Sequence, residues 1–423
     1  MNYTISVFGL GFVGLTTALA FAEKGNKVFG YDVNEQRVKT LKAGKLPFVE
    51  PGLDEALLKH QDKNFVITSA PEKAVIESDF IFLCVGTPGG EHGEADLKFL
   101  YSAIDLFSSV IDDGKFRTIV LKSTVPPSTT AERIIPYLEA KGLKPGSQFG
   151  VANNPEFLRE GKCWDDMINA DRIVCGTSDL RGEEMLRSLY SDFSSPFFAV
   201  SLNTGEFIKY LSNTLLATMI SYSNEMSKIA DAIGGIQIKE AFEVLHMDRR
   251  WGNATMSSYV YPGCGYGGYC LPKDTAAMVA TSLSKGYEPQ ILEKVIAVND
   301  SMPQYMAGKI TKHAKKTDKI GILGLSFKPD SDDVRDSSSA KIIRILMREG
   351  YNNIVAYDPM ANKPFSDEYE FNIEYASSKE ELCIFSDVVV LVTAWKEFED
   401  IRNYINEKPL IDCRYFTLNL EQE

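Results

Sequence analysis

One cysteine stands where a nucleophile could be built. Cys270 lies in residues 265–274, GYGGYCLPKD, behind a glycine-rich turn and ahead of a Lys-Asp pair. Because Pro272 suits the first turn of a helix, we predict that Cys270 lies at a helix N-terminus, where partial positive charge favours the thiolate. Asp274, four residues on, would share its helix face. The alternative for an isolated cysteine is a buried structural thiol beside a glycine turn.

A glycine pattern near the N-terminus is typical of dinucleotide binding. Gly9, Gly11 and Gly14 form G-x-G-x-x-G directly after a strand-like run. The first glycine permits a tight bend, the second admits a pyrophosphate, and the third allows a helix to pack closely on the strand. Asp32 ends the next predicted strand, where a carboxylate would bind ribose hydroxyls and repel a 2′-phosphate. NAD is therefore favoured over NADP; the alternative is a glycine turn without a ligand.

Two further polar pairs have helical i, i+4 spacing. Lys209 and Asn213 could stabilise an oxyanion, or they could be a solvated lysine and an asparagine whose hydrogen bonds are satisfied. Glu156 and Glu160 could act in a site, or they could be surface charges at the start of a helix.

Two loops follow predicted strands, where ligand sites of open α/β sheets gather. One is residues 122–126, KSTVP. The other, residues 327–336, contains Lys328 and Arg335, whose side chains suit phosphate. The alternative for the second loop is an exposed stretch of mixed charge.

Composition excludes several classes of function. The chain has 423 residues, a net charge of −13, 44% apolar and 24% charged residues, which fits two or three domains of a globular protein. No basic block indicates nucleic acid binding, and no apolar run is long enough for a membrane span. Seven cysteines and four histidines lie scattered, so we expect no metal site and a reducing, cytoplasmic setting.

The elements that must position these residues follow from apolar periodicity. Up to about residue 200, strand-like and helical segments alternate, which predicts a parallel, doubly wound sheet. Residues 203–206, NTGE, resemble a capping box. Residues 207–233 follow without proline or glycine and are apolar almost all round, so we expect one long helix that is buried between domains or subunits. Strand–helix alternation resumes near residue 319.

In this order, the motifs resemble the UDP-glucose 6-dehydrogenase family, within the UDP-glucose/GDP-mannose dehydrogenases. The resemblance covers nearly the whole chain, through residues 9–14, 85–88, 122–126, 154–161, 209 with 213, 265–274, 324–335 and 411–414. It implies an α/β fold of two Rossmann-like doubly wound domains joined by a long central helix. The domains would be an NAD-binding Rossmann domain (1–200), a central helical dimerisation region (201–315) and a UDP-sugar-binding α/β domain (316–423).

The resemblance also implies an NAD-dependent oxidation of a sugar C6 alcohol to a carboxylate by two hydride transfers, in a homodimer that binds a UDP-sugar. Cys270 would form a thiohemiacetal and then a thioester, a covalent role that suits a thiolate. Asp274 with Lys209 would place a water, and Glu156 and Thr124 would serve water activation and hydrolysis. The implied catalytic residues are Cys270, Lys209, Asn213, Asp274, Glu156 and Thr124. The implied NAD-binding residues are Gly9, Gly11, Phe12, Val13, Gly14, Asp32, Thr87, Thr124, Glu160 and Arg335. The implied substrate-binding residues are Glu156, Phe157, Leu158, Lys209, Asn213, Arg250, Tyr266, Gly267, Lys328 and Arg414.

Three alternatives stay open at this stage. The GYCLPKD form resembles the UDP-glucose branch, yet the same chemistry could act on UDP-galactose, GDP-mannose or a UDP-N-acetylhexosamine. A two-electron hydroxyacid dehydrogenase would share the Rossmann domain and long helix but would leave Cys270 without a purpose. A non-catalytic sugar-nucleotide sensor would not need Cys270, Lys209 and Asp274 together. Arg249 is adjacent to Arg250, so either could be the substrate arginine.

Overall fold

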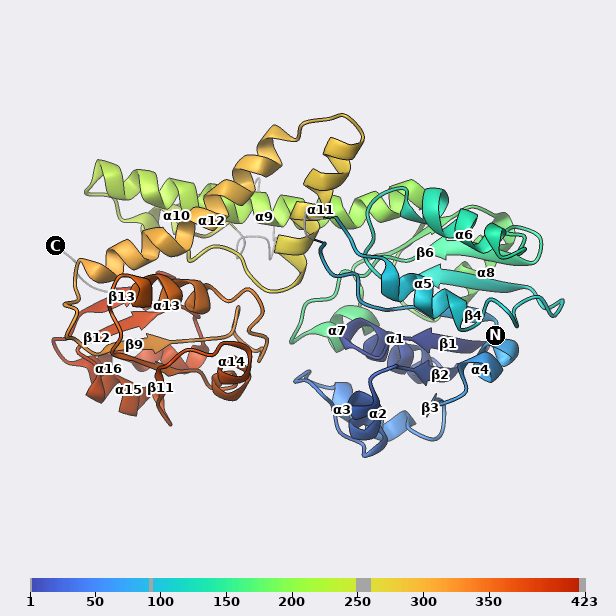
Figure 1. The fold of residues 1–423 in the computed structure, drawn as a ribbon, viewed down its shortest axis with the longest axis horizontal. Coiled ribbons are helices and arrows are strands. Elements are labelled where there is room, and N and C mark those ends of the chain that lie inside the picture. Colours follow the sequence, from blue (N-terminus) through green and yellow to red (C-terminus); the bar gives the residue numbers. More distant parts are fainter. Residues whose placement is uncertain (1, 91–93, 249–259, 418–423) are drawn as a thin grey trace. The chain divides into compact units, whose positions relative to one another are not determined.

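A computed structural model describes residues 2–90, 94–248 and 260–417 of the chain. The chain divides into two compact units, Met1–Ser212 and Asn213–Glu423, and each carries its own sheet (Figure 1).

The first unit is built on an eight-stranded sheet in the order β3-β2-β1-β4-β5-β6-β7-β8. Its strands are β1 (Thr4–Phe8), β2 (Lys27–Tyr31), β3 (Phe65–Ile67), β4 (Phe80–Leu83), β5 (Arg117–Leu121), β6 (Phe149–Asn153), β7 (Ile173–Thr177) and β8 (Phe197–Ser201). The first six follow the Rossmann order, with a switch point between β1 and β4.

The expectation of a wholly parallel sheet was wrong for one pair. Strand β7 runs antiparallel to β6, whereas the other neighbours are parallel. The segment after β6 does not cross back over the sheet to the amino ends of the parallel strands. Strand β7 therefore begins at the end of the sheet where β6 stops. That end consequently holds an irregular loop, residues 154–162.

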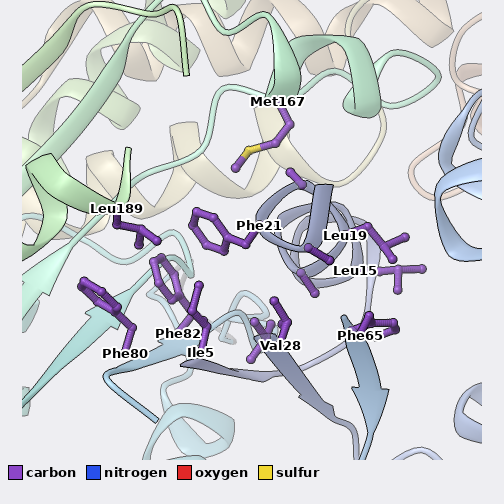
Figure 2. Packing of buried hydrophobic residues seen from close by; sticks show 14 of the residues in the cluster. Ile5, Leu15, Leu19, Phe21, Val28, Phe65, Phe80, Phe82, Met167 and Leu189 are labelled. Carbon is purple, nitrogen blue, oxygen red and sulfur yellow. The ribbon is translucent and has the colours of Figure 1, made fainter. Parts of the chain in front are cut away.

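Helices cover this sheet. They are α1 (Phe12–Glu23), α2 (Glu35–Lys42), α3 (Leu53–His60), α4 (Pro71–Glu77), α5 (Lys98–Asp105), the π-helical turn η1 (Thr130–Ile134), α6 (Ile135–Ala140), α7 (Cys163–Ile168) and α8 (Leu180–Leu189). Figure 2 shows Phe21 of α1 packed among Ile5, Val28 and Phe82 of the central strands. This fully buried contact fixes the helix that follows the glycine turn.

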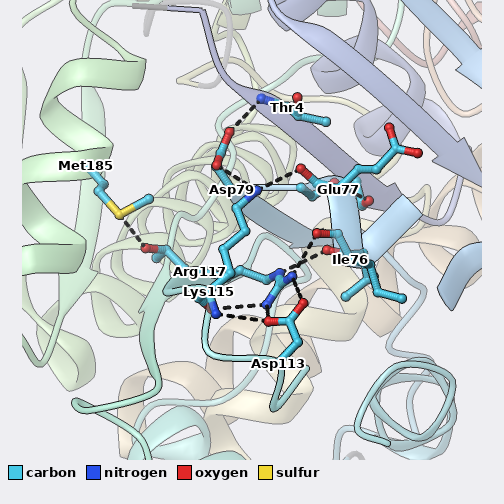
Figure 3. A network of polar contacts seen from close by, with 12 residues as sticks. Thr4, Ile76, Glu77, Asp79, Asp113, Lys115, Arg117 and Met185 are labelled. Atoms are coloured by element: carbon cyan, nitrogen blue, oxygen red, sulfur yellow. Dashed lines mark hydrogen bonds and ion pairs between the residues drawn. The ribbon is translucent and has the colours of Figure 1, made fainter. Parts of the chain in front are cut away.

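A fully buried arginine, Arg117, is the first residue of β5 and lies at the amino ends of the parallel strands, away from the glycine turn (Figure 3). The Arg117 guanidinium pairs with Asp113 at 2.6 Å and donates to the carbonyls of Val75 and Ile76 at 2.9 and 2.8 Å. The Arg117 guanidinium lowers the pKa of Asp113 to about 2. A charge this deeply buried is tolerated because its donors are satisfied, which makes the cluster structural.

The long helix α9 (Leu202–Ile233) confirms the expected single helix. It starts earlier than predicted, because β8 leads directly into it and the Thr204 amide donates to Ser201 Oγ at 3.3 Å. The predicted capping box was wrong: Glu206 accepts instead from the amide and hydroxyl of Thr130, at 2.8 and 2.5 Å.

The second unit is built on a parallel five-stranded sheet in the order β11-β10-β9-β12-β13. Its strands are β9 (Ile320–Leu323), β10 (Ile354–Tyr357), β11 (Glu374–Tyr375), β12 (Val388–Leu391) and β13 (Leu410–Asp412). The remaining helices are α10 (Ile238–His246), α11 (Cys270–Ser284), α12 (Gln290–Thr311), α13 (Ser338–Arg348), α14 (Asn362–Glu368), α15 (Lys379–Phe385), the 3₁₀ turn η4 (Lys396–Asp400) and α16 (Arg402–Ile405). The predicted fold class, two Rossmann-like sheets with a long helix between them in sequence, is confirmed.

Candidate active site

The glycine turn joins β1 to α1 and has the geometry that a dinucleotide needs. Gly9 has φ +91° and its amide donates to Tyr31 O at 2.8 Å. A Cβ on Gly14 would stand 1.8 Å from Gly9 O, whereas a Cβ on Gly11 would meet nothing within 4 Å. The first and third glycines are therefore required by backbone packing, and the second leaves open space where a pyrophosphate could approach.

Asp32 lies at the carboxyl end of β2 and is buried. Its Oδ2 accepts from the Leu10 amide at 2.7 Å, and its Oδ1 accepts from the Asn34 amide at 2.8 Å. Arg37, which the sequence motifs did not indicate, pairs with Oδ2 at 2.8 Å. The carboxylate is thus fixed beside the glycine turn, as a ribose-binding acid would be. Together, the turn and the acid fit NAD, with Phe12 and Val13 half-buried in the first turn of α1.

Two threonines from the list of candidate residues lie close together beyond the carboxyl ends of β4 and β5 in the same sheet. Thr87 Oγ1, beyond β4, donates to Thr124 O, beyond β5, at 2.7 Å. Ser123 Oγ donates to Val85 O at 2.6 Å and so fastens the same two loops. This arrangement places both threonines where open sheets bind ligands.

Glu156 and Lys209 form a buried ion pair. Their charged atoms lie 2.9 Å apart, with 7% and 6% of the side chains exposed. Glu156 also accepts from the Leu158 amide at 2.6 Å. Burial alone would raise the pKa of Glu156, but the Lys209 ammonium and the Leu158 amide hold this pKa below its usual value. The surface-charge alternative for Glu156 and the solvated-lysine alternative for Lys209 are therefore wrong.

Neighbouring residues that the motifs did not mark hold this loop in place. Residues 154–160 are irregular, not the start of a helix. Buried Lys122 donates to Asn154 Oδ1 at 2.8 Å, and burial lowers the pKa of this lysine. The Glu50 carboxylate accepts from the amides of Gly161 and Cys163, at 2.9 and 2.7 Å. Half-buried Glu160 is thereby anchored on its C-terminal side.

Cys270 is exposed and is the first residue of α11, as predicted. The turn ahead of it requires glycine: Gly265 and Gly268 have φ +92° and +77°. A Cβ on Gly267 would stand 2.4 Å from Asp336 O. These close approaches set the direction from which the chain enters the helix that begins at Cys270.

Asp274 lies one helical turn after Cys270 and is almost fully buried. Its Oδ2 accepts from Asn213 Nδ2 at 2.7 Å, and its Oδ1 pairs with Lys273 Nζ at 2.5 Å. Asn213 belongs to α9, so the carboxylate joins the two helices. Lys209 precedes Asn213 by one turn of the same helix.

The candidate nucleotide residues of the second unit lie in loops after its strands. Arg414 Nε donates to Val392 O at 2.8 Å, and the Arg335 guanidinium pairs with Asp333 at 2.5 Å and stacks over the Tyr269 ring at 4.6 Å. Buried Tyr266 is held through its amide, which donates to Asn299 Oδ1 at 2.8 Å. Half-buried Gly267 precedes Gly268, whose amide donates to Arg335 O at 3.0 Å.

Lys328 extends over the Phe327 ring at 5.4 Å. Leu158 and Phe157 flank Glu156, and the Phe157 ring lies 5.7 Å from Lys209 Nζ and 4.0 Å from the Arg172 guanidinium. The predicted substrate arginine, Arg250, and its neighbour Arg249 lie outside the described residues.

The seven cysteines differ in accessibility. Cys270 is exposed, Cys84 is half-buried, and the other five are buried. Buried Cys264 packs by its sulfur against the carbonyls of Cys413 and Val392, at 3.7 and 3.9 Å. Across the described parts of the chain, no group of His, Cys, Asp and Glu side chains could hold a metal ion. Within the same ranges, every helix is too short or too polar to cross a bilayer.

The turn and acid of the first unit are those of an NAD-binding domain, and comparison with known proteins gives the family. Models of the UDP-glucose/GDP-mannose dehydrogenase family match residues 3–194 (NAD binding domain), 203–301 (central domain) and 321–419 (UDP binding domain). The chain belongs to this family.

Individual relatives agree over the full length. A UDP-glucose 6-dehydrogenase of Haloferax volcanii is 33% identical, with 97% of this chain and 96% of the relative covered. One of Rickettsia prowazekii is 36% identical, with 97% and 94% covered. A solved UDP-glucose dehydrogenase from Pyrobaculum islandicum superimposes with a TM-score of 0.92 at 34% identity, covering 98% of this chain and 95% of that chain.

Proposed function

We propose that this protein oxidises UDP-glucose to UDP-glucuronate in two steps, with Cys270 as the covalent carrier. The observation that carries the proposal is the exposed thiol at the first residue of α11, one turn from a buried carboxylate that is fixed by Asn213. A thiol at a helix N-terminus is favoured as thiolate, and a thiolate can retain an aldehyde between two oxidations.

The proposed steps balance as follows. The C6 alcohol loses a proton and a hydride to become an aldehyde, and NAD supplies the hydride acceptor in both oxidations. Cys270 Sγ adds to the aldehyde carbon while the carbonyl oxygen gains a proton, which gives a thiohemiacetal. Loss of a second hydride and proton leaves a thioester. Water then displaces the thiol and releases the carboxylate.

The remaining residues act on protons and charge in this scheme. Lys209 and Asn213 stabilise the oxygen anions at C6, and Asp274 with Lys209 places the water that takes up protons. Glu156, an anion beside Lys209, activates the hydrolytic water together with Thr124. Phe157, Leu158, Tyr266 and Gly267 shape the sugar side, whereas Lys328 and Arg414 bind the nucleotide. Thr87, Glu160 and Arg335 bind the dinucleotide.

The test is a stoichiometry. With excess NAD, each UDP-glucose should yield two NADH and no free aldehyde, measured by absorbance and product mass. One NADH per substrate would favour an ordinary two-electron dehydrogenase. A parallel panel of UDP-galactose, GDP-mannose and UDP-N-acetylhexosamines would expose a different preferred sugar.

A variant pair tests the nucleophile itself. Cys270→Ser should retain UDP-glucose binding and lose turnover by roughly a thousandfold or more, because an ester hydrolyses more slowly than a thioester. Cys383→Ala, in α15, is the control and should keep near-normal turnover. Turnover of Cys270→Ser equal to that of the unsubstituted protein would remove Cys270 from the mechanism.

We further propose that the chain forms a homodimer through α9. What supports this is an apolar stripe at i, i+4, i+8 spacing: Phe207, Leu211 and Leu215 are 45%, 53% and 49% exposed. The sequence predicted that this face is buried, but its side chains are exposed in a single chain. A second copy of the chain would bury these exposed side chains. Leu211→Asp should shift sedimentation towards a monomer, whereas Leu180→Asp, an exposed position in α8, should not. A dimer that survives Leu211→Asp would contradict the proposal.

A further inference from the structure

The two sheets share one local construction. In the first unit, Gly9 follows β1 and the Leu10 amide donates to Asp32, the acid after β2. In the second, Gly324 follows β9 and the Leu325 amide donates to Asp358, the acid after β10, also at 2.7 Å. Both glycines have φ +91°. The Gly9 amide donates to Tyr31 O and the Gly324 amide donates to Tyr357 O, each at 2.8 Å, and each acceptor is the residue just before the aspartate. Asp358 therefore stands where a Rossmann sheet keeps its ribose acid.

Asp358 is occupied by the protein on both of its oxygens. Its Oδ2 accepts from the amides of Leu325 and Ser326 and from Trp395 Nε1, at 2.7, 3.0 and 3.1 Å, and Ser326 Oγ lies at 3.1 Å. Its Oδ1 accepts from the amides of Met360 and Ala361, both at 2.9 Å. The residue is 2% exposed. A carboxylate so engaged is a positioning group.

The segment that Asp358 holds leads to Lys328. Ser326 Oγ lies 3.0 Å from Lys328 O, and Thr393 Oγ1 donates to Ser326 O at 2.6 Å. Ser337 and Ser339 hydroxyls donate to Leu325 O and Gly324 O, at 2.7 and 2.6 Å. Consequently the backbone from 324 to 328 has little freedom, and the Lys328 side chain leaves it from a fixed point.

The same segment reaches the turn that precedes Cys270. Phe327 follows Ser326, and its ring lies so close to Gly268 that a Cβ there would stand 2.8 Å from it. Displacement of the Asp358-held backbone would thus move Lys328 and also loosen the glycine turn.

We propose that Asp358 is a positioning residue for nucleotide binding: it fixes residues 324–328 so that Lys328 meets the nucleotide phosphates, and it does not bind a ribose itself. This rests on the proposed function, because it takes Lys328 as a contact of the nucleotide. An asparagine cannot replace the carboxylate. Each oxygen of Asp358 accepts from backbone amides, and the side-chain nitrogen of an asparagine, which would stand in place of one oxygen, cannot accept a hydrogen bond.

The experiment compares UDP and NAD binding by isothermal titration in the full-length protein. Asp358→Asn should weaken UDP by about tenfold or more, since buried amides lose an acceptor, and should leave NAD affinity within about twofold. Steady-state kinetics should show a raised KM for UDP-glucose with a smaller change in kcat. Asp179→Asn, which removes a helix-capping carboxylate in the first unit, is the matched control and should alter neither affinity.

Lys328→Ala separates the two levels of the argument. If it weakens UDP but Asp358→Asn does not, the positioning role is overturned while the nucleotide assignment stands. If Lys328→Ala leaves UDP binding intact, the nucleotide assignment falls, and the inference with it. Equal loss of UDP and NAD in Asp358→Asn would mean a general structural role and would also overturn the proposal.

A second variant covers the case in which Asp358→Asn does not fold. Ser326→Ala removes only the hydroxyl between Asp358 and Lys328 O, so it should raise the UDP dissociation constant by about two- to fivefold with NAD binding unchanged. An unchanged UDP dissociation constant in folded Ser326→Ala would count against the proposal.

Discussion

At the scale of single residues, partners decide what a charged group can do. Glu156 and Lys209 are far apart in the chain, yet each is buried against the other at 2.9 Å. Burial favours the neutral form of Glu156, and the neighbouring Lys209 ammonium opposes this effect on the pKa of Glu156. A lysine and a glutamate that looked like surface residues in the sequence are therefore a preformed charged pair within the first unit.

Asp32 and Arg37 predict how the cofactor preference can be altered. NAD should be preferred over NADP by more than tenfold, about 1.4 kcal/mol, because Asp32 repels a 2′-phosphate. Asp32→Ala should narrow this preference doubly, since it removes the anion and releases Arg37 from the 2.8 Å ion pair. Initial rates with both cofactors measure it.

The control is the double variant Asp32→Ala/Arg37→Ala. It should not show the improved NADP use of Asp32→Ala, because the released arginine is gone, and its NAD use should stay reduced, because Asp32 is still absent. If Asp32→Ala leaves the preference unchanged, another group recognises the ribose.

At the scale of elements, the apolar runs predicted the sheet centres well. Strands β1, β4, β9 and β12 are fully or almost fully buried, so hydrophobicity marks them. Strand β8 is also an apolar run, FFAVS, yet every one of its positions is half-buried or exposed, so an apolar run alone does not show that a strand is buried. The reversal of β7 depends on where the preceding loop runs, which no local pattern encodes.

The local structure of the candidate site was predictable where its residues form a contiguous motif: residues 9–14 join a strand to a helix, and α11 begins at Cys270. Supporting residues were not predictable, because they come from remote segments: Glu50 holds Gly161 from 111 positions away. Glu206 shows the same limit, since its spacing suggested a local cap but its partner is Thr130.

Glu206 predicts a pH dependence of stability. Burial raises the pKa of Glu206 to about 7 from 4.5. The folded state therefore binds the proton more tightly than the unfolded state. The stability that this group contributes is complete below about pH 4.5 and is lost as the pH rises through about 7. Glu206→Gln, which stays neutral and can still accept from Thr130, should flatten this loss.

Urea unfolding at pH 5 and pH 8 measures the effect. At pH 8 Glu206→Gln should be more stable than the unsubstituted protein by about 1–3 kcal/mol, with a smaller difference at pH 5. Glu139→Gln on α6 serves as the control and should show no such trend. A variant whose stability falls in parallel with the original protein between these pH values would refute the assignment.

At the scale of the whole molecule, the net charge of −13 opposes the binding of anionic ligands. We nevertheless expect different single residues to be needed for UDP-glucose and for NAD. A distributed negative charge repels both anionic ligands, so local cations must supply the affinity. Arg414→Ala should weaken UDP-glucose by about tenfold or more, the loss of one charge-assisted hydrogen bond, and spare NAD. Arg335→Ala should weaken NAD and spare UDP-glucose.

Isothermal titration with each ligand checks both variants, and circular dichroism excludes misfolding. Equal losses of both ligands in correctly folded variants would contradict the assignment of these two arginines.

The accessibility of the thiols has a practical consequence for the intact protein. Of seven cysteines, only Cys270 is exposed. A single equivalent of a mild alkylating reagent should therefore modify one position per chain, and the amount consumed should count the accessible Cys270 thiols in any preparation. The same selectivity would allow a fluorescent or spin label to be placed at Cys270 without a cysteine-free background.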